Sequence, residues 1–278
     1  MDHPIVSVIT PVYNAAVFLP RLFECVGSQN GVEVEHILVD DCSSDNSLQI
    51  MRGLAWGKES IKIISMPKNE GPVVARNLAI QQARGKYLAF LDADDYWLPN
   101  KSLVQSRFME ETGAALSFSD YRFISEDGYL VGRRLRGPNS VSWAVHHMSR
   151  YLGCLTIMVN REICVGFHFP NISPSYRAED FLAWSSVILQ HGPVLRCKYD
   201  LARYAVVTNS RSSNSIRAAK SVWMLYYFVE NIPLFRALSY FGVYLVSTVL
   251  KRAWFKPRWQ AEKIDGPLSA SYRLKARS

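Results

Sequence analysis

Three aspartates stand together where an apolar stretch of the sequence ends. In AFLDADDYWLP, over residues 89–99, Asp92, Asp94 and Asp95 follow the last apolar residue of the stretch. Carboxylates this close repel one another, so keeping them ionised requires a nearby cation. Their oxygens are the ligands that Mg²⁺ and Mn²⁺ prefer, and such ions commonly complete their coordination with substrate phosphates. A solvated turn is the alternative for an isolated acidic cluster, but this one directly follows an apolar stretch.

Two further carboxylate pairs are candidates for binding or catalysis. Asp40 and Asp41 end a second apolar stretch, and a carboxylate in a crevice can accept the N–H of a nucleobase, which suits Asp41. An Asx turn with a helix cap is the alternative, and it is the better interpretation for Asp45. Glu179 and Asp180 open a predicted helix. Either they only interact favourably with the helix dipole, or one of them is a general base aimed at an acceptor hydroxyl.

The segments that must position these clusters alternate between strand and helix patterns. Short apolar, β-branched stretches predict strands over 5–9, 33–39, 61–65 and 87–91. Capped or glycine-bounded segments predict helices over about 16–28, 46–55 and 71–85, the first with Asn14 as a plausible N-cap. This alternation predicts a parallel sheet covered by helices. Because ligands bind beyond the carboxyl ends of parallel strands, the clusters TPVYN, DDCSSD and DADD are expected to meet in one crevice.

The pattern changes after residue 100. A hairpin is predicted over 115–131, strands over 154–159 and 201–207, and a helix that carries EDFLAWSSVILQ and ends near Gly192. No repeat or linker separates these segments from the first half. The prediction is therefore one α/β domain with a mixed, mainly parallel sheet over residues 1–210, followed by a tail.

The tail, residues 211–278, is basic and rich in aromatic residues. The chain has a net charge of +8, and 12 of its 32 Lys and Arg but only three of its 24 Asp and Glu lie in this tail. Its longest uncharged stretch, 237–250, has 14 residues, too few for a helix to span a bilayer of about 30 Å. Flanking basic residues and tryptophans are typical of helices that lie in the membrane interface. We therefore expect a membrane-surface partner instead of nucleic acid, although RNA bases also stack on aromatic side chains.

Several classes of protein are disfavoured. Five scattered cysteines without a C-x-x-C pair argue against a disulfide framework or a zinc site and favour a reducing compartment. No basic segment followed by a long apolar one opens the chain, so no signal peptide is expected. Dinucleotide oxidoreductases are disfavoured because no G-x-G-x-x-G follows the first strand, and no P-loop is present.

Other conspicuous residues have less specific interpretations. His146 and His147 lack metal-ligand spacing and are expected to be an exposed pair. Trp97 and Trp184 are candidates to pack against a sugar, but large aromatic residues beside a crevice are at least as often part of the core.

Five sequence blocks resemble a known family. SVITPVYN, ILVDDCSSD, GPVVARN, FLDADDYW and EDFLAW follow one another between residues 7 and about 184. In this order and spacing they resemble the inverting glycosyltransferases of family 2, which have the GT-A fold. The segments YLGCLTIMV and LARYAVVTNSRSSNSIRAAKSVW further resemble bacterial cell-surface polysaccharide enzymes, among them teichuronic-acid and O-antigen transferases.

The resemblance implies a binding site for a nucleotide-sugar. Thr10, Pro11 and Tyr13 would line the pocket of a UDP-sugar, with Tyr13 stacked on the uracil. Asp41, the second aspartate of its block, would hold the base, and Arg76 would lie near the nucleotide.

The resemblance also implies roles for the other carboxylates. Asp94 would contact the ribose and, with Asp95, the metal ion, Mn²⁺ or Mg²⁺, that bridges the diphosphate, while Asp92 would support them. Asp180 would be the catalytic base, with Glu179 adjacent.

Together these implications describe an enzyme that moves a sugar from UDP to a polyprenyl-diphosphate-linked oligosaccharide during O-antigen or capsule synthesis. It would act at the cytoplasmic face of the membrane, where the tail holds it. Arg211 and Arg217 would form a lid over the diphosphate or belong to a polar linker. The alternative is a non-catalytic, membrane-docked subunit that binds a nucleotide-sugar. Loss of the carboxylates of the ED or DADD blocks would indicate that, and both are present.

Overall fold

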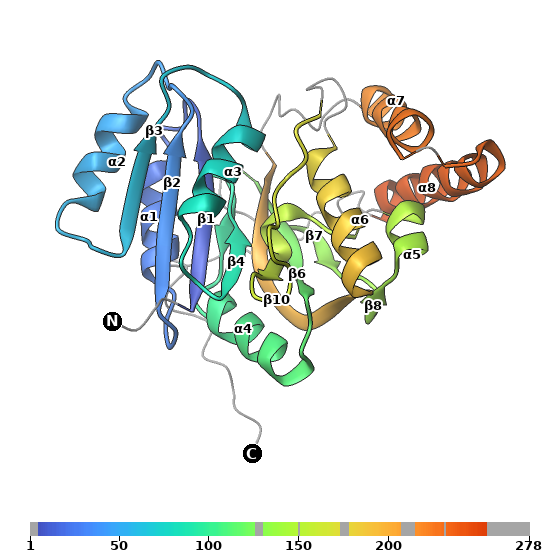
Figure 1. The fold of residues 1–278 in the computed structure, drawn as a ribbon, viewed down its shortest axis with the longest axis horizontal. Helices are drawn as coiled ribbons and strands as arrows, with labels where there is room; N and C mark the ends of the chain where they lie inside the picture. The colour runs from blue at the N-terminus through green and yellow to red at the C-terminus, as the bar shows by residue number, and fades with distance from the viewer. Residues whose placement is uncertain are drawn as a thin grey trace.

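A computed structural model shows a mixed sheet with helices on both faces, as predicted (Figure 1). It describes residues 5–125, 130–149, 151–172, 178–206, 215–230 and 232–254. The first half alternates strand and helix in the order β1 (Val6–Val12), α1 (Leu19–Gly27), β2 (Val34–Asp40), α2 (Ser47–Ala55), β3 (Ile61–Ser65), α3 (Pro72–Gln82) and β4 (Tyr87–Phe90). The four strands pair in parallel in the order β3-β2-β1-β4, so their carboxyl ends share one edge.

The second half extends the same sheet with strands of both directions. The order continues from β4 through β9 (Ile157–Asn160), β6 (Leu116–Ser125) and β10 (Val194–Val206) to β5 (Tyr96–Trp97). β9 is antiparallel to β4 and β6, whereas β10 is parallel to β6. The carboxyl ends of β6 and β10, and the amino end of β9, therefore lie at the edge where β1 and β4 end. Two short pairings complete the sheet: β7 (Leu130–Leu135) joins β6, and β8 (Ser140–Val141) joins β10.

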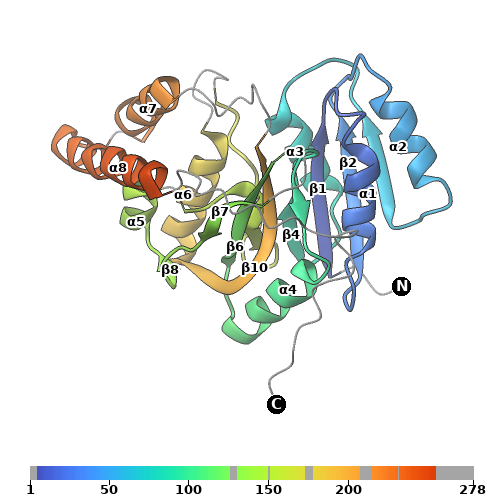
Figure 2. The same cartoon turned by 180° about the vertical axis from the view of Figure 1, so that it is seen from behind.

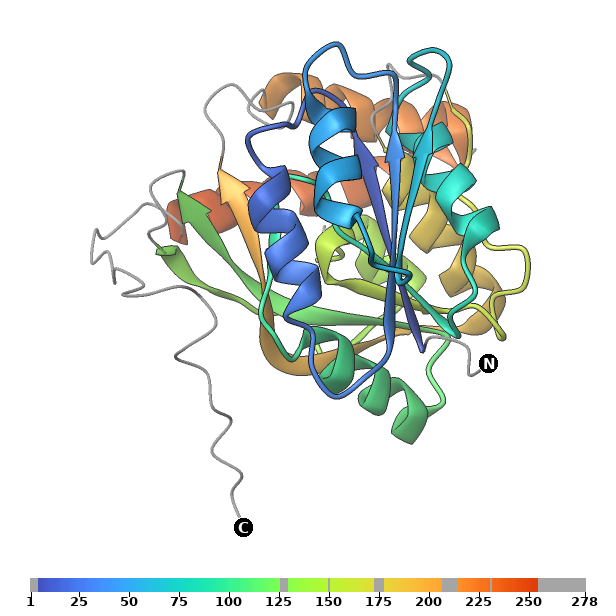
Figure 3. The same cartoon turned by 90° about the vertical axis from the view of Figure 1, so that its left-hand side faces the viewer.

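Helices cover both faces of the sheet, because successive side chains of a strand point to opposite faces and both faces are apolar. Val8 and Leu38 belong to the cluster beneath α1, α2 and α4 (Lys101–Thr112), whereas their neighbours Ile9 and Ile37 belong to the cluster beneath α3 and α6 (Glu179–His191). Figure 2 shows α1 and α4 on one face, and Figure 3 views the sheet edge-on with α1 to one side and α3 and α6 to the other.

Both candidate tryptophans are part of the core. Trp97 lies in the first cluster and Trp184 in the second, and neither side chain is exposed. The core interpretation is confirmed for both residues.

Two helices and the early part of a strand escaped prediction. α4 buries Lys101, Ser102, Gln105 and Ser106 against the sheet, so its sequence lacks the apolar period of an amphipathic helix. α5 (Trp143–Met148) is a short helix that was also not predicted. β10 begins at Val194 instead of residue 201. Its early part was not predicted because it contains charged residues, of which Arg196 is paired with Asp120 on the neighbouring strand β6. The predicted hairpin is confirmed as the antiparallel β6–β7 pair, and its turn lies outside the described residues.

The described part of the predicted tail packs on the domain. It forms α7 (Ser215–Met224), the π-helical turn η2 (Leu225–Val229) and α8 (Leu234–Trp254). Its buried side chains form one cluster with the start of α6, which comprises Ala178, Phe181, Val222, Leu225, Tyr226, Ile232, Ala237 and Tyr244. None of the described helices combines the length and the apolar character needed to cross a membrane. The predicted domain boundary at residue 210 falls outside the described residues.

The prediction of an exposed histidine pair is wrong. His146 and His147 are 1% and 0% exposed, because α6 and the C-terminal segment, comprising α7, η2 and α8, cover the end of α5. The sequence of α5 alone carries no sign of this cover, which comes from residues distant in the chain.

Candidate active site

The loops that follow β1 and β2 are tied together by Asn14. Its backbone lies in the left-handed region, with φ of 49°, and its Oδ1 accepts hydrogen bonds from the backbone N–H groups of Ser44, at 2.8 Å, and Asp45, at 3.3 Å. The prediction that Asn14 caps the first helix is wrong, since α1 starts at Leu19 after Phe18. The side chain instead joins two predicted site loops. The turn interpretation of Asp45 is supported, because its Oδ1 accepts the N–H of Ser47 at 2.9 Å.

The three residues predicted from the first loop differ in accessibility. Thr10 is fully buried, and its hydroxyl lies 2.9 Å from Nε2 of His36, whose pKa burial lowers to about 3. Pro11 is half-buried in β1, opposite Val39. Tyr13, just past the strand, is 49% exposed. Of the three, Tyr13 has the most accessible side chain, an aromatic ring at this edge of the sheet.

Asp41 is buried, and its carboxylate organises the start of α3. Its Oδ1 accepts the backbone N–H of Glu70 at 2.7 Å and its Oδ2 that of Gly71 at 2.9 Å. Gly71 has φ of 92°, a conformation that favours glycine. A carboxylate has about four acceptor sites, so these two bonds leave capacity for a nucleobase N–H.

Arg76 links three of the predicted blocks. From α3, its Nη2 lies 2.5 Å from Oδ1 of Asp92, and its Nη1 lies 3.9 Å from Oε1 of Glu179, at the start of α6. The arginine is 6% exposed. Burial alone would lower its pKa, but the charge of Asp92, its hydrogen bond to the guanidinium and the charges of Cys154 and Glu179 together outweigh burial and raise the pKa above its usual range. The tertiary structure thus brings the DADD and ED blocks together around one buried cation.

The pKa values of Asp95 and Asp94 are raised, and the charge of Arg21 opposes this only in part. Burial raises the pKa of Asp95 well above its usual value, and the charges of Asp92 and Asp94 raise it further. Its Oδ1 accepts the backbone N–H of Ala205, from β10, at 3.0 Å. Burial and Asp92 also raise the pKa of Asp94, whose backbone carbonyl accepts a hydrogen bond from Nη2 of Arg21 at 2.7 Å.

These carboxylates fit a divalent cation, because an ion bound there would relieve both the desolvation and the mutual repulsion. Among the described residues, no three His, Cys, Asp or Glu side chains gather into a metal site made by protein alone. A Mg²⁺ or Mn²⁺ ion held by one or two carboxylates and by substrate phosphates needs no such group.

The ED block occupies the first turn of α6. Burial raises the pKa of Glu179, the charge of Asp180 raises it further, and Arg76 opposes both effects. Oδ1 of Asp180 accepts the backbone N–H of Phe181 at 2.7 Å. Glu179 therefore lies within the cluster around Arg76, and Asp180 lies beside it.

Cys154 is a residue of this site that the sequence interpretation missed. Burial raises the pKa of its thiol well above the usual value, and the charges of Arg76, Asp92, Asp180 and Glu179 all act on it. Its place before the apolar segment of β9 is the available signal. Because β9 is antiparallel to β4, its amino end lies at the edge where β4 ends and the aspartates follow.

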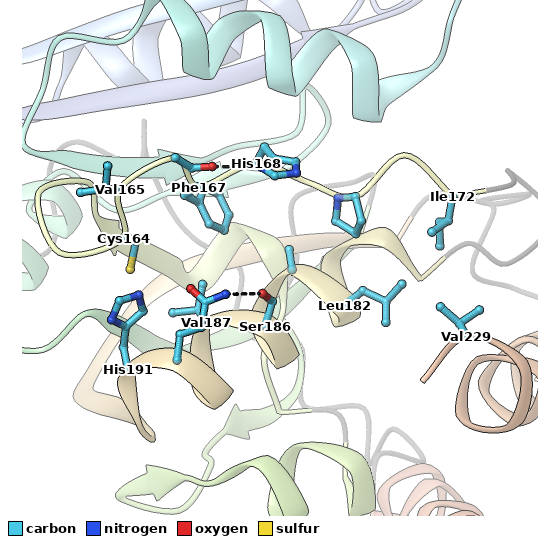
Figure 4. A pocket seen from close by; sticks show the side chains of 14 residues that line it. Cys164, Val165, Phe167, His168, Ile172, Leu182, Ser186, Val187, His191 and Val229 are labelled. Atoms are coloured by element: carbon cyan, nitrogen blue, oxygen red, sulfur yellow. Dashed lines mark hydrogen bonds between the residues drawn. The ribbon is translucent and has the colours of Figure 1, made fainter. Parts of the chain in front are cut away.

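A cavity of about 330 Å³ lies apart from this cluster. Figure 4 shows it between the segment 164–172 and α6, where Phe167, Leu182 and Val187 contribute apolar surface. None of the predicted site residues lines it. The predicted lid arginines, Arg211 and Arg217, have side chains outside the described part of the chain.

Comparisons with known proteins show the family of this chain. The family described as "Glycosyl transferase family 2" matches residues 7–168. The chain is 35% identical to the putative teichuronic acid biosynthesis glycosyltransferase TuaG of Bacillus subtilis, over 90% of this chain and 98% of that protein. It is 30% identical to WfgD of Escherichia coli, named UDP-Glc:alpha-D-GlcNAc-diphosphoundecaprenol beta-1,3-glucosyltransferase, over 91% of this chain and 97% of that one.

Solved structures share the fold. S. aureus TarS 1-349 in complex with UDP superposes with a TM-score of 0.61 at 20% identity, covering 89% of this chain and 86% of that one. Mannosyltransferase PcManGT from Pyrobaculum calidifontis, in complex with GDP-Man and Mn2+, superposes with a TM-score of 0.62 at 16% identity, covering 91% and 75% of the two chains. The predicted GT-A fold is thus confirmed, and the chain belongs to glycosyl transferase family 2 and is a glycosyltransferase of bacterial surface-polysaccharide type.

Proposed function

We propose that this enzyme transfers a sugar, with inversion, from a UDP-sugar to a polyprenyl-diphosphate-linked oligosaccharide during O-antigen or capsule synthesis. The bridge from Asp92 through Arg76 to Glu179 supports the proposal most strongly, because it brings together the DADD and ED blocks, to which we assign the donor and the acceptor. The printed name of WfgD supports both a UDP-sugar donor and a lipid-linked acceptor.

On the donor side, each residue has a role that its position allows. The half-exposed ring of Tyr13 stacks on the base, and Asp41 accepts a base N–H at the end of β2. Asp94 holds the ribose, and Asp95 with Asp94 would hold Mn²⁺ or Mg²⁺. Such an ion supplies Lewis-acid stabilisation of the diphosphate charge as the donor bond breaks.

On the acceptor side, Asp180 takes the proton of the acceptor hydroxyl. The new oxygen–carbon bond forms on the face of the anomeric carbon opposite UDP, and the bond from that carbon to the phosphate oxygen breaks. UDP leaves with both bonding electrons, so one displacement inverts the anomeric configuration. Arg76 offsets the charge of Glu179 beside the base.

The C-terminal segment supports a peripheral position at the cytoplasmic membrane face. Successive turns of α8 expose apolar side chains that lie, at 100° per residue, within an arc of about 120°: Leu234, Phe235, Leu238, Leu245 and Val246. Phe235 is 82% exposed. The helix contains no Asp or Glu, and the sequence after it is strongly basic. An apolar helix face next to basic residues suits an anionic lipid surface, where the lipid-linked acceptor resides.

Turnover of a donor panel tests the chemistry. Purified protein is incubated with Mn²⁺ and UDP-, GDP- or dTDP-sugars, with and without a lipid-linked acceptor, beside Asp95→Ala, Asp180→Asn and the exposed-site control Glu59→Gln. We expect metal-dependent turnover of one UDP-sugar, lost in Asp95→Ala, strongly reduced in Asp180→Asn and retained in the control. NMR of the product determines the anomeric configuration. Binding without turnover, even with acceptor, would favour the non-catalytic subunit, and no nucleotide binding would refute the proposal.

Vesicle flotation tests the membrane surface separately. We expect the protein to float with vesicles that contain anionic lipid, and Phe235→Ser to weaken this binding. Trp56→Ser is the matched control, because Trp56 is 89% exposed at the end of α2. Equal flotation of Phe235→Ser and the native protein would exclude this face of α8.

A further inference from the structure

A closed ring of hydrogen bonds joins α5, α6 and the residue that follows η2. Nε2 of His147 lies 2.5 Å from Oε2 of Glu230, and Oε1 of Glu230 accepts the hydroxyl of Ser185 at 2.7 Å. Oγ of Ser185 accepts the indole N–H of Trp143 at 2.9 Å, and the carbonyl of Trp143 lies 2.8 Å from Nδ1 of His147. His147 and Ser185 are buried, the side chain of Glu230 is 12% exposed, and Trp143 is half-buried. Every polar side chain of this ring has its partner inside the protein.

The ring fixes how many protons it holds. A carbonyl only accepts, so Nδ1 of His147 carries hydrogen and donates to Trp143. The contact between Nε2 and Glu230 then needs one more proton, shared by an imidazolium–carboxylate or imidazole–carboxylic acid pair. In both forms the pair is neutral overall. The indole of Trp143 lies against the imidazole, with the ring centroids 3.8 Å apart and the ring planes tilted by 31°.

α5 and η2 also contact α6 next to Asp180, the proposed base. Phe181, the residue after Asp180, stacks on His146 with centroids 4.1 Å apart, and its carbonyl oxygen lies 3.0 Å from Nε2 of His146. Tyr226 from η2 donates its hydroxyl to the carbonyl of His147 and packs against Phe181. The first turns of α6 are therefore held from the side of α5 and the C-terminal segment.

The opposite side of α6 is less fully packed. With 100° per residue, Ala183, Val187 and Gln190 lie on the side of the helix away from Ser185, and these residues border the cavity of about 330 Å³ (Figure 4). A cavity provides few contacts to resist movement of the helix. Trp184 and Ile188 pack the middle of α6 into the core beneath the sheet. The contacts around Glu230 and Phe181 add restraint to the first turns of the helix, beside Asp180.

We propose that Glu230 and His147 are positioning residues for the transfer reaction: they fix α6 to the C-terminal segment and so keep Asp180 aimed at the acceptor hydroxyl. The inference rests on the proposed function, in which Asp180 is the base. It gives the C-terminal segment a role inside the active site in addition to any contact with lipid. Misplacement of a base by about 1 Å costs up to roughly a hundredfold in rate.

Two substitutions of one residue separate positioning from simple stability. Glu230→Ala opens the ring. Glu230→Gln keeps it closed with a neutral histidine, because the amide N–H donates to Nε2 of His147 and the amide oxygen accepts the Ser185 hydroxyl. Met109→Ala, in the buried face of α4, is the control that lowers stability without contacting α6.

The kinetic readout is kcat and the KM for the donor, measured well below the melting temperature of each variant. Glu230→Ala is expected to lower kcat about ten- to a hundredfold while the KM for UDP-sugar changes less than about twofold. Glu230→Gln restores kcat, and Met109→Ala leaves it unchanged. An unchanged kcat in Glu230→Ala, or an equal loss in Met109→Ala, would overturn the inference.

Amide hydrogen exchange gives a readout that needs no activity. Exchange over residues 178–185 should accelerate in Glu230→Ala and return to the native rate in Glu230→Gln. Unchanged exchange in Glu230→Ala would also overturn the inference. If the native protein transfers no sugar at all, the proposed function fails, and the exchange comparison still decides whether Glu230 restrains α6.

Discussion

Replacing Asp95 by Asn should stabilise the metal-free protein while it removes activity. The carboxylate is buried, and both burial and its neighbours Asp92 and Asp94 raise its pKa, so its charge destabilises the fold at neutral pH. Asn has the same shape, and its Oδ1 still accepts the N–H of Ala205, which Asp95 binds at 3.0 Å. Relief of such functional-site strain typically contributes about 1 kcal/mol, or about 2–4 °C in Tm for a chain of this size.

The pH dependence of this effect has a definite sign. Because the folded-state pKa of Asp95 lies above the ordinary carboxyl value of 3.8, protonation favours the folded state. The stability from this group is fully present below that ordinary value and is lost as the pH rises through the raised folded-state value. The difference in Tm between Asp95→Asn and the native protein should therefore be near zero in acid, grow as the pH rises through this window, and then level off.

Added ligand should reverse the order of stability. If Asp95 holds the metal, saturating Mn²⁺ and UDP at about 100 times their Kd stabilise the native protein by about 2.7 kcal/mol, and the variant gains much less. Thermal shift with and without ligand measures this, alongside a loss of kcat of about 10²–10³-fold. A lower Tm of apo Asp95→Asn, or an equal gain with Mn²⁺ and UDP in both proteins, would refute the reasoning.

Three further predictions concern how the site is held together. Arg76→Ala removes the cation shared by two carboxylates, and urea unfolding should show a loss of about 2 kcal/mol that shrinks as the pH falls and the carboxylates protonate; a loss independent of pH would contradict the charge argument. Gly85→Ala places a Cβ 2.7 Å from the backbone N of Ser7 and should lower the free energy of unfolding by about 1–3 kcal/mol. The control Gly53→Ala in α2, with open space around it, should be neutral or stabilising. Equal Tm values for the two variants would show that β1 shifts easily to make room for the added methyl group. Asn14→Ala removes the acceptor that joins the loops after β1 and β2, so the KM for the donor should rise with little change in kcat, and steady-state kinetics at varied donor would expose the opposite pattern.

The alternating half of the fold was predictable because its signals are local. Apolar β-branched stretches, Gly71-Pro72 at a helix start and polar clusters at strand ends all act over a few residues, and the strands and helices up to β4 follow them. α4 and the start of β10 escaped because their buried polar residues have distant partners. Gln105 of α4 donates to the backbone carbonyl of Thr156, and Arg196 forms two hydrogen bonds with Asp120, so neither segment shows an apolar period.

For the site, the sequence by itself determined which chemical groups are present and that three clusters end strands at one edge of a parallel sheet. Only the tertiary structure decided that Arg76 joins Asp92 to Glu179, that Cys154 enters the cluster, and that His147 is buried against Glu230. The physical reason is that a side chain's type is local, whereas its charge state and burial depend on what surrounds it in space. Asp92 and Glu179 acquire a common counter-ion only when β9 and the segments after it complete the sheet, and no pattern within either block encodes that meeting.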